Sequence, residues 1–300
     1  MYLLYLFAWK LIALLPEKSA YKLAEYVSDR IYKKNGKGIK QLRSNYARVM
    51  PEYSAEKLEE LTKLGMRSYL RYWFDTFRLS KWSENRIIQT TQVIRENLLR
   101  DPVQSKRGCI VALPHAGNWD HAAAYFCSTG IPLTAVVEKL KPEAIFKKFL
   151  AYRESIGIEA ISHKEKTIPI LTERLQAGKL IALVADRDMS RNGIEVNFFG
   201  KTAKMPAGPA ILAIKTGAPI TTAYVRYVSS GIEIIFDETI MPTDSGSEEE
   251  QIKIITQSIA DNFAKRIKEY PVDWHMLQRI WIDEEPVSYT HLTLPTNREV

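Results

Sequence analysis

His115 and Asp120 are the residues whose types and spacing point most clearly to chemistry. They lie in Leu113-Pro114-His115-Ala116-Gly117-Asn118-Trp119-Asp120, after an apolar run and before a helical pattern. A short, near-continuous apolar run suits a buried strand of a parallel sheet. The sequence therefore predicts a His and an Asp at a strand-to-helix turn, where α/β proteins commonly bind their ligands.

A carboxylate in the first turn of the helix can fold back toward the imidazole in the preceding loop. There, Asp120 would fix the tautomer of His115 and stabilise its cation, so that the other ring nitrogen accepts a proton from a hydroxyl. The alternative is purely structural. Asp120 would then favour the helix dipole and His115 would fill a turn.

The elements that must position this pair alternate along the chain. Apolar runs predict strands at 110–113, 133–137, 158–161, 180–185, 220–228 and 232–236, and helical patterns cover 119–130, 142–156, 165–177 and 206–216. This alternation predicts an α/β core with a mostly parallel or mixed sheet flanked by helices. The preceding segment predicts helices, including one that begins near Ser54 and a polar helix-and-turn stretch over 83–101.

We therefore divide the chain into a helical N-terminal region (1–100), an α/β core (101–286) and a tail (287–300). The tail, VSYTHLTLPTNREV, follows a natural end at Pro286 and does not continue the pattern. It reads as a translated sequencing adapter, so His291 takes no part in the functional argument.

Composition and missing motifs narrow the function. The chain is 46% hydrophobic and 26% charged, and Cys109 and Cys127 are its only cysteines, both in apolar surroundings, which disfavours a disulfide framework or a cysteine metal site. The first strand is not followed by a Gly-x-Gly-x-x-Gly motif, and the sequence has neither a P-loop lysine nor a Gly-x-Ser-x-Gly elbow. His121 beside Asp120 could form a metal site with His115, but further ligands do not cluster around them, and we predict none.

The chain has a net charge of +7, and several of its basic residues are clustered in one segment of the sequence. Seven basic residues and no acid stand between Arg30 and Arg48, beside an apolar N-terminus, MYLLYLFAWKLIALL. As a helix, fifteen residues span about 22 Å, against the roughly 30 Å of a bilayer core, so we predict an interfacial anchor on an anionic membrane surface. Packing of the apolar segment against the protein's own core, nucleic acid as the partner of the basic cluster, and a merely solvated basic face remain alternatives.

Four separated motifs resemble one family. LPHAGNWD, EKLKPEAIFKKFLAYRESIG, ADRDMSRNGIEVNFFGKTAKMPAGPAILA and YPVDWHMLQRIW occur in the order typical of the lipid A biosynthesis (lauroyl/myristoyl) acyltransferase family. Within that family, the chain is most similar to the phosphatidylinositol mannoside acyltransferases of mycobacteria and related actinobacteria. The resemblance covers nearly all of residues 1–286. It implies transfer of a long fatty acyl chain from acyl-CoA, a co-substrate, to a sugar hydroxyl of a membrane glycolipid, with no cofactor. It places the protein at the cytoplasmic face of the inner membrane, peripheral or monotopic.

The resemblance also assigns roles to single residues. His115 and Asp120 match the family's His-x4-Asp pair, Arg153 matches an active-site arginine, and Asp186 stands where the mannoside branch has Glu. We further expect Asn118 and Lys139 to bind substrate, with the basic side chains near Arg153 facing the phosphates of CoA or simply solvent. We expect Arg187 and Asp188, which follow Asp186, either to line the acceptor site or to pair with each other.

The chemistry agrees with the resemblance, because a sugar hydroxyl attacks a thioester only with a positioned base. The resulting oxyanion needs donors, and amides near Gly117 and the start of the Trp119 helix are candidates. Three other functions stay open: a same-family enzyme for another glycolipid or a lipid A precursor, a basic membrane-associated protein that binds nucleic acid, and a metal-dependent phosphohydrolase. Since no nucleic-acid motif accompanies the basic cluster, we do not expect a nucleic-acid partner.

Overall fold

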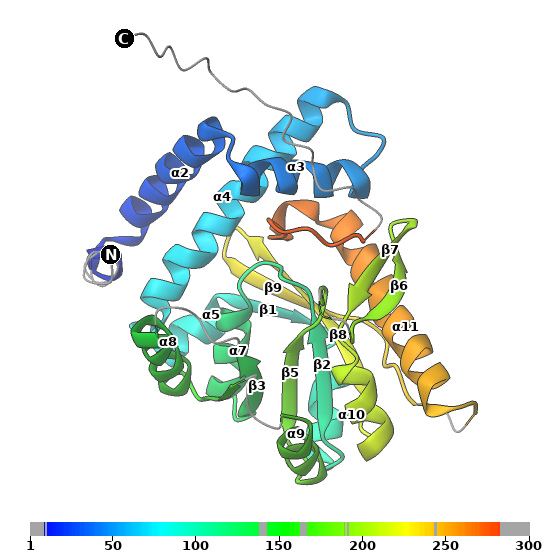
Figure 1. Cartoon of the computed structure of the whole chain (residues 1–300). Helices are drawn as coiled ribbons and strands as arrows, with labels where there is room; N and C mark the ends of the chain where they lie inside the picture. Colours follow the sequence, from blue (N-terminus) through cyan, green and yellow to red (C-terminus); the bar gives the residue numbers. More distant parts are fainter. Residues whose placement is uncertain are drawn as a thin grey trace, which may run out of the picture.

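A computed structural model describes residues 9, 11–137, 143–162, 167–188, 190, 192–242 and 245–282, without the side chains of 143–146, 148 and 149 (Figure 1). The tail over 287–300, most of the predicted anchor and Lys139 therefore lie outside the described residues. The helices are α2 (Glu17–Lys34), α3 (Lys37–Val49), α4 (Ala55–Leu79), α5 (Glu84–Gln89), α6 (Asn97–Gln104), α7 (Trp119–Ser128), α8 (Glu143–Ser155), α9 (Thr167–Gln176), α10 (Gly208–Thr216), α11 (Glu248–Glu269) and the 3₁₀ turn η1 (Pro271–Asp273). The strands are β1 (Thr91–Ile94), β2 (Cys109–Leu113), β3 (Leu133–Val137), β4 (Ile158–Ser162), β5 (Leu180–Val184), β6 (Ile194–Phe198), β7 (Lys201–Met205), β8 (Ile220–Val228) and β9 (Gly231–Phe236).

The described strands form a seven-stranded sheet in the order β1-β9-β8-β2-β5-β3-β4 and a separate β6-β7 hairpin. Neighbours in the large sheet run parallel except β8 and β9, which pair antiparallel. Helices flank this sheet, and the N-terminal helices precede it, which confirms the predicted α/β class (Figure 1).

The centre of the sheet is buried on both faces. All five residues of β2 are buried, and alternate residues enter different apolar clusters, with Ile110 and Ala112 on one face and Val111 and Leu113 on the other. A central parallel strand covered on both sides must be apolar at every position, which is why its run is continuous.

One strand lies within the region expected to be helical. β1 adds to the edge of the sheet, parallel to β9, and its residues alternate between half-buried and exposed. The half-exposed pattern of a four-residue edge strand carries little apolar signal, so the polar sequence around it reads as helix and turn. The hairpin strands β6 and β7 also lie outside the predicted set.

The N-terminal helices pack along α4. This helix begins at Ala55, close to the expected position, and Ser54 caps it with a hydroxyl that accepts the backbone N–H of Lys57 at 3.3 Å. At the start of the described chain, Trp9 and Ile12 are buried, and the Trp9 ring lies 4.8 Å from that of Phe77. Leu11 and Leu14, which neighbour Ile12 in the sequence, are exposed. The described part of the apolar segment thus has a buried face and an exposed face. Within the described residues, none of the helices has the length and apolar character needed to span a membrane.

Candidate active site

His115 and Asp186 meet at the carboxyl end of the sheet. β2 and β5 are parallel neighbours, and their last residues, Leu113 and Val184, pair in register. Each functional residue follows its strand by two positions, so the register brings the two side chains together although 71 positions separate them. This is the sheet edge where open α/β folds bind ligands.

The carboxylate of Asp186 holds the imidazole of His115 through several bonds. Oδ1 of Asp186 lies 2.6 Å from Nδ1 of His115. Oδ2 accepts the backbone N–H of His115 and the indole N–H of Trp274, both at 3.0 Å. Asp186 is completely buried, whereas 41% of the His115 side chain is exposed. Because Asp186 engages Nδ1, Nε2 is the ring nitrogen of His115 that could exchange a proton with a substrate.

Electrostatics favour the ionised carboxylate. Burial by itself would raise the pKa of Asp186, but the charge of His115 and the hydrogen bonds from His115 and Trp274 keep this pKa below its ordinary value. An ionised Asp186 in turn stabilises a positive charge on the ring of His115, as a general base requires once it has taken a proton.

Asp120 has different partners, which corrects the expectation that it orients His115. It lies in the first turn of α7, where Oδ1 accepts the Nε–H of Arg153 at 3.0 Å and Oδ2 accepts the hydroxyl of Tyr72 at 3.1 Å. The first turn of α7 faces α4 and α8, so donors from those helices satisfy the carboxylate. Burial and the nearby charge of Asp120 raise the pKa of Tyr72 well above its ordinary value, so Tyr72 stays a hydrogen-bond donor.

The segment after α11 packs against the loop that carries His115. The backbone N–H of His275 donates to the carbonyl of His115 at 2.7 Å, and Nε2 of His275 lies 2.8 Å from the hydroxyl of Ser68. That hydroxyl also donates to Oδ1 of Asp273 at 2.5 Å. Burial, aided by the charge of His115, lowers the pKa of His275 to about 3, so this buried ring is neutral. The site also contains four residues that were not predicted individually from the sequence: Ser68, Asp273, Trp274 and His275. The last three lie within the YPVDWHMLQRIW motif.

Gly117 is required by close packing in the loop that carries His115. Its φ is +57°, and a Cβ there would stand 2.4 Å from the carbonyl oxygen of Val225. Its N–H donates to the carbonyl of Asp273 at 2.8 Å. That amide is therefore occupied, which removes it from the oxyanion candidates and leaves the first amides of α7.

Comparison with known proteins identifies the family. The family model described as bacterial lipid A biosynthesis acyltransferase matches residues 1–282. The chain belongs to this family. It is 38% identical over 282 residues to the phosphatidylinositol mannoside acyltransferase of Mycolicibacterium smegmatis, covering 93% of this chain and 90% of the relative. The Mycobacterium tuberculosis protein of the same name is 34% identical over 283 residues, covering 93% and 87%. The 1-acyl-sn-glycerophosphate acyltransferase PlsC of Thermotoga maritima is a structural match with a TM-score of 0.38 and 12% identity, over 82% of this chain and 95% of that chain.

Of the remaining predicted site residues of this acyltransferase, Asn118 is buried, whereas Arg187 and Asp188 are half-buried. Asn118 caps α7 through its Oδ1, which accepts the N–H of His121 at 2.9 Å, and its side chain is completely buried. The structure thus shows Asn118 as the cap of α7 and Asp186 as the partner of His115, and contact of either residue with substrate stays a prediction. Arg187 and Asp188 are half-buried in the loop after β5, where Asp188 accepts the N–H of Ser190 at 2.7 Å.

Metal ligands do not gather in the part of the acyltransferase that the structure describes. Among the described residues, His, Cys, Asp and Glu side chains form no group of three or more that could hold a metal ion. His121 is buried, and its Nε2 lies 3.2 Å from the hydroxyls of Thr90 and Thr91. Burial lowers the pKa of His121 to about 4, as expected for a neutral ring in the core.

Proposed function

We propose that this acyltransferase moves a long-chain fatty acyl group from acyl-CoA to a sugar hydroxyl of a membrane glycolipid, specifically a phosphatidylinositol mannoside. The contact of His115 Nδ1 with the buried Asp186 carries the chemistry of this proposal, because it makes a positioned base at the edge of the sheet. The names of the two mycobacterial relatives support the choice of acceptor.

In the proposed reaction, Nε2 of His115 takes the proton of the acceptor hydroxyl as the oxygen attacks the thioester carbonyl. The same nitrogen then returns the proton to the leaving thiolate of CoA. The ester C–O bond forms, the C–S bond breaks and the proton moves from oxygen to sulfur, so the protein needs no covalent acyl intermediate. Asp186 fixes the tautomer and stabilises the imidazolium in both steps.

The oxyanion of the tetrahedral intermediate needs donors fixed in advance. We assign this role to the backbone amides of Trp119 and Asp120, because they open α7 next to His115. The positive end of the helix dipole also favours negative charge at this point.

Asp120 acts in this proposal through Arg153 rather than through the base. The guanidinium of Arg153 is held by Oδ1 of Asp120 and is largely buried, so its orientation toward substrate is fixed. A planar guanidinium suits phosphate or sugar oxygens, and we assign it to substrate binding. Arg187 and Asp188, in the loop after Asp186, are proposed to border the acceptor.

We propose that the enzyme docks peripherally on the cytoplasmic face of the membrane through its N-terminal helices. Among the described residues of these helices and the segment before them, large apolar side chains are exposed at Leu11, Leu14, Leu23, Tyr26 and Ile31. Lys22, Arg30, Lys33 and Lys34 are exposed on α2 beside them. Apolar side chains for the acyl layer and cations for anionic headgroups form an interfacial surface.

The test measures release of CoA from palmitoyl-CoA by the full chain with vesicles that contain a phosphatidylinositol mannoside or a lipid A precursor. We expect release that depends on the mannoside and falls by about 10²- to 10⁴-fold in His115→Ala. His291→Ala, in the tail, is the matched control and should retain activity. Turnover with the lipid A precursor alone would overturn the acceptor, and undiminished turnover in His115→Ala would overturn the base.

A further inference from the structure

A cavity lies next to the residues that support the loop of His115. It has a volume of about 500 Å³ and is bounded by α2, α4, the end of β8 and the segment from Glu269 to Asp273. Ser68 and Asp273 line it and are also the hydrogen-bond partners that link to His275. His115 does not line this cavity. It is thus a separate compartment, of a size typical of small-molecule sites.

Three arginines line the cavity: Arg67, Arg71 and Arg226. Arg67 and Arg71 are four residues apart on α4 and so lie on the same face of the helix. Carboxylates outside the cavity lining hold two of the guanidiniums in place. Arg67 bonds Asp29 through two nitrogens at 2.7 and 2.8 Å, and Arg226 bonds Glu233 at 2.6 Å.

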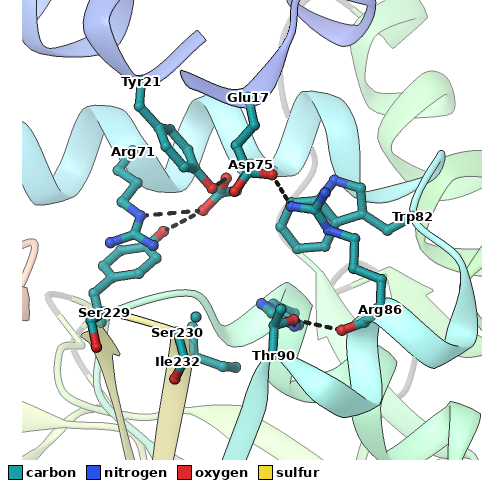
Figure 2. Close-up of a pocket in the computed structure, with 13 residues that line it drawn as sticks. Glu17, Tyr21, Arg71, Asp75, Trp82, Arg86, Thr90, Ser229, Ser230 and Ile232 are labelled. Atoms are coloured by element: carbon teal, nitrogen blue, oxygen red, sulfur yellow. Dashed lines mark hydrogen bonds and ion pairs between the residues drawn. The ribbon is translucent and has the colours of Figure 1, made fainter. Parts of the chain in front are cut away.

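Arg71 is held differently. Its guanidinium lies over the rings of Tyr227 at 4.0 Å and Tyr21 at 5.0 Å. Its Nε forms an ion pair with Asp75 at 3.8 Å, which is beyond hydrogen-bond distance, so this buried nitrogen has no hydrogen-bond partner among the described residues. Figure 2 shows Arg71 beside Asp75 in an adjoining cavity of about 80 Å³, which shares Tyr21, Arg71 and Tyr227 with the larger one. Asp75 already accepts the hydroxyls of both tyrosines, at 2.8 and 3.2 Å.

The acidic residues of the lining do not oppose an anion next to Arg71. Both oxygens of Asp273 are engaged, by the hydroxyl of Ser68 and by the backbone N–H of Tyr227. Glu25 and Glu269 are exposed, and Glu269 is bonded to Arg266 at 2.8 Å. Carboxylates in these outer positions suit hydroxyl or ammonium donors of a ligand whose anionic part lies deeper.

We propose that this cavity binds the phosphodiester headgroup of a membrane lipid, with the phosphodiester at Arg67, Arg71 and Arg226 and a hydroxyl- or amine-bearing group toward Glu25 and Glu269. Guanidinium groups are the preferred partners of phosphate oxygens. Leu64, an exposed lining residue on α4, and Ala24 on α2 give an apolar contact for the glycerol and the first carbons of the acyl chains. The inference rests on the proposed function only in that the ligand comes from a membrane.

The test is direct binding, measured by titration calorimetry of the full chain without acyl-CoA. The probes are dihexanoyl-phosphatidylinositol below its micelle concentration, inorganic phosphate, and the uncharged octyl glucoside. We expect the phosphatidylinositol to bind at least tenfold more tightly than the other two, and its Kd to rise about tenfold or more in Arg71→Lys and in Arg67→Gln. A parallel arm with dihexanoyl-phosphatidylglycerol distinguishes a general phospholipid from an inositol lipid such as the acceptor, and both sources satisfy the proposal.

Arg174→Gln is the matched control. Arg174 bonds Glu159 through two nitrogens as Arg67 bonds Asp29, but it lies on α9, away from the cavity (Figure 1). Binding that is equal in all variants, absent at millimolar lipid, or equally tight for inorganic phosphate would overturn the headgroup site. Arg67→Gln removes only a partly exposed ion pair, so it keeps the test decisive if Arg71→Lys folds poorly. Because the assay involves no turnover, its failure leaves the acyl-transfer proposal intact, and the reverse also holds.

Discussion

Asp186 and Asp120 are both buried carboxylates at the same end of the sheet, yet their surroundings differ in kind. Asp186 bonds a histidine, which can gain and lose a proton near neutral pH, together with an indole and an amide. Asp120 bonds an arginine and a tyrosine, which keep their protons in this range. The difference teaches that the partner, more than the carboxylate itself, determines whether an aspartate supports proton transfer or only holds a neighbour in place.

The largest expected effect separates the two carboxylates kinetically. Asp186→Asn should lower kcat by about 10²- to 10⁴-fold with little change in the KM for acceptor, because the base loses the charge that stabilises its cation. Steady-state rates of CoA release measure both constants. A kcat within threefold of the wild type would mean that Asp186 only packs against the ring.

Asp120→Asn should instead act on stability and binding. Arg153 would remain largely buried without its anion, which lowers the free energy of unfolding by about 3 to 5 kcal/mol. We expect a higher KM for the acceptor and a kcat within about tenfold of the wild type. Urea unfolding with the same kinetic assay tests this, and a loss in kcat as large as that of Asp186→Asn would restore Asp120 as a direct partner of the base.

The histidines sharpen the comparison through pH. The pKa of His275 is lowered from 6.5 to about 3, so below pH 6.5 the unfolded chain binds a proton that the native protein excludes. His275 therefore makes the free energy of unfolding fall as pH drops, by up to about 1.4 kcal/mol per pH unit. In His275→Gln this contribution disappears, and the difference between variant and wild type should shrink as pH falls from 6.5 to 4. Urea titrations at each pH test this, and a constant difference would contradict it.

The smallest effect concerns Tyr72. Tyr72→Phe removes the hydroxyl that donates to Asp120 and leaves the bond from Arg153, so we expect a loss of about 1 to 2 kcal/mol in stability. CoA release at saturating substrate should change by less than threefold. A larger loss of kcat would show that the position of Asp120 affects the reacting groups themselves.

Much of the fold could be predicted because the central strands carry continuous apolar runs that only a buried sheet explains. β1 was missed because a half-exposed edge strand has no such run. The pairing of His115 with Asp186 depends on which strand lies next to β2, and neither periodicity nor spacing reveals strand order. Asp120 was predicted to orient His115 because the two residues are close in sequence. In the structure, the Asp120 side chain instead bonds Tyr72 and Arg153, which belong to other helices.

The three residues that fasten the His115 loop are among the last of the domain to be synthesised. Asp273 holds the amide of Gly117, Trp274 bonds the carboxylate of Asp186, and His275 bonds the carbonyl of His115. In a nascent chain whose residues 273–275 are still inside the ribosome, the loop of His115 would lack these three hydrogen bonds. The acyltransferase site would thus be complete only once this segment has folded against the loop of His115.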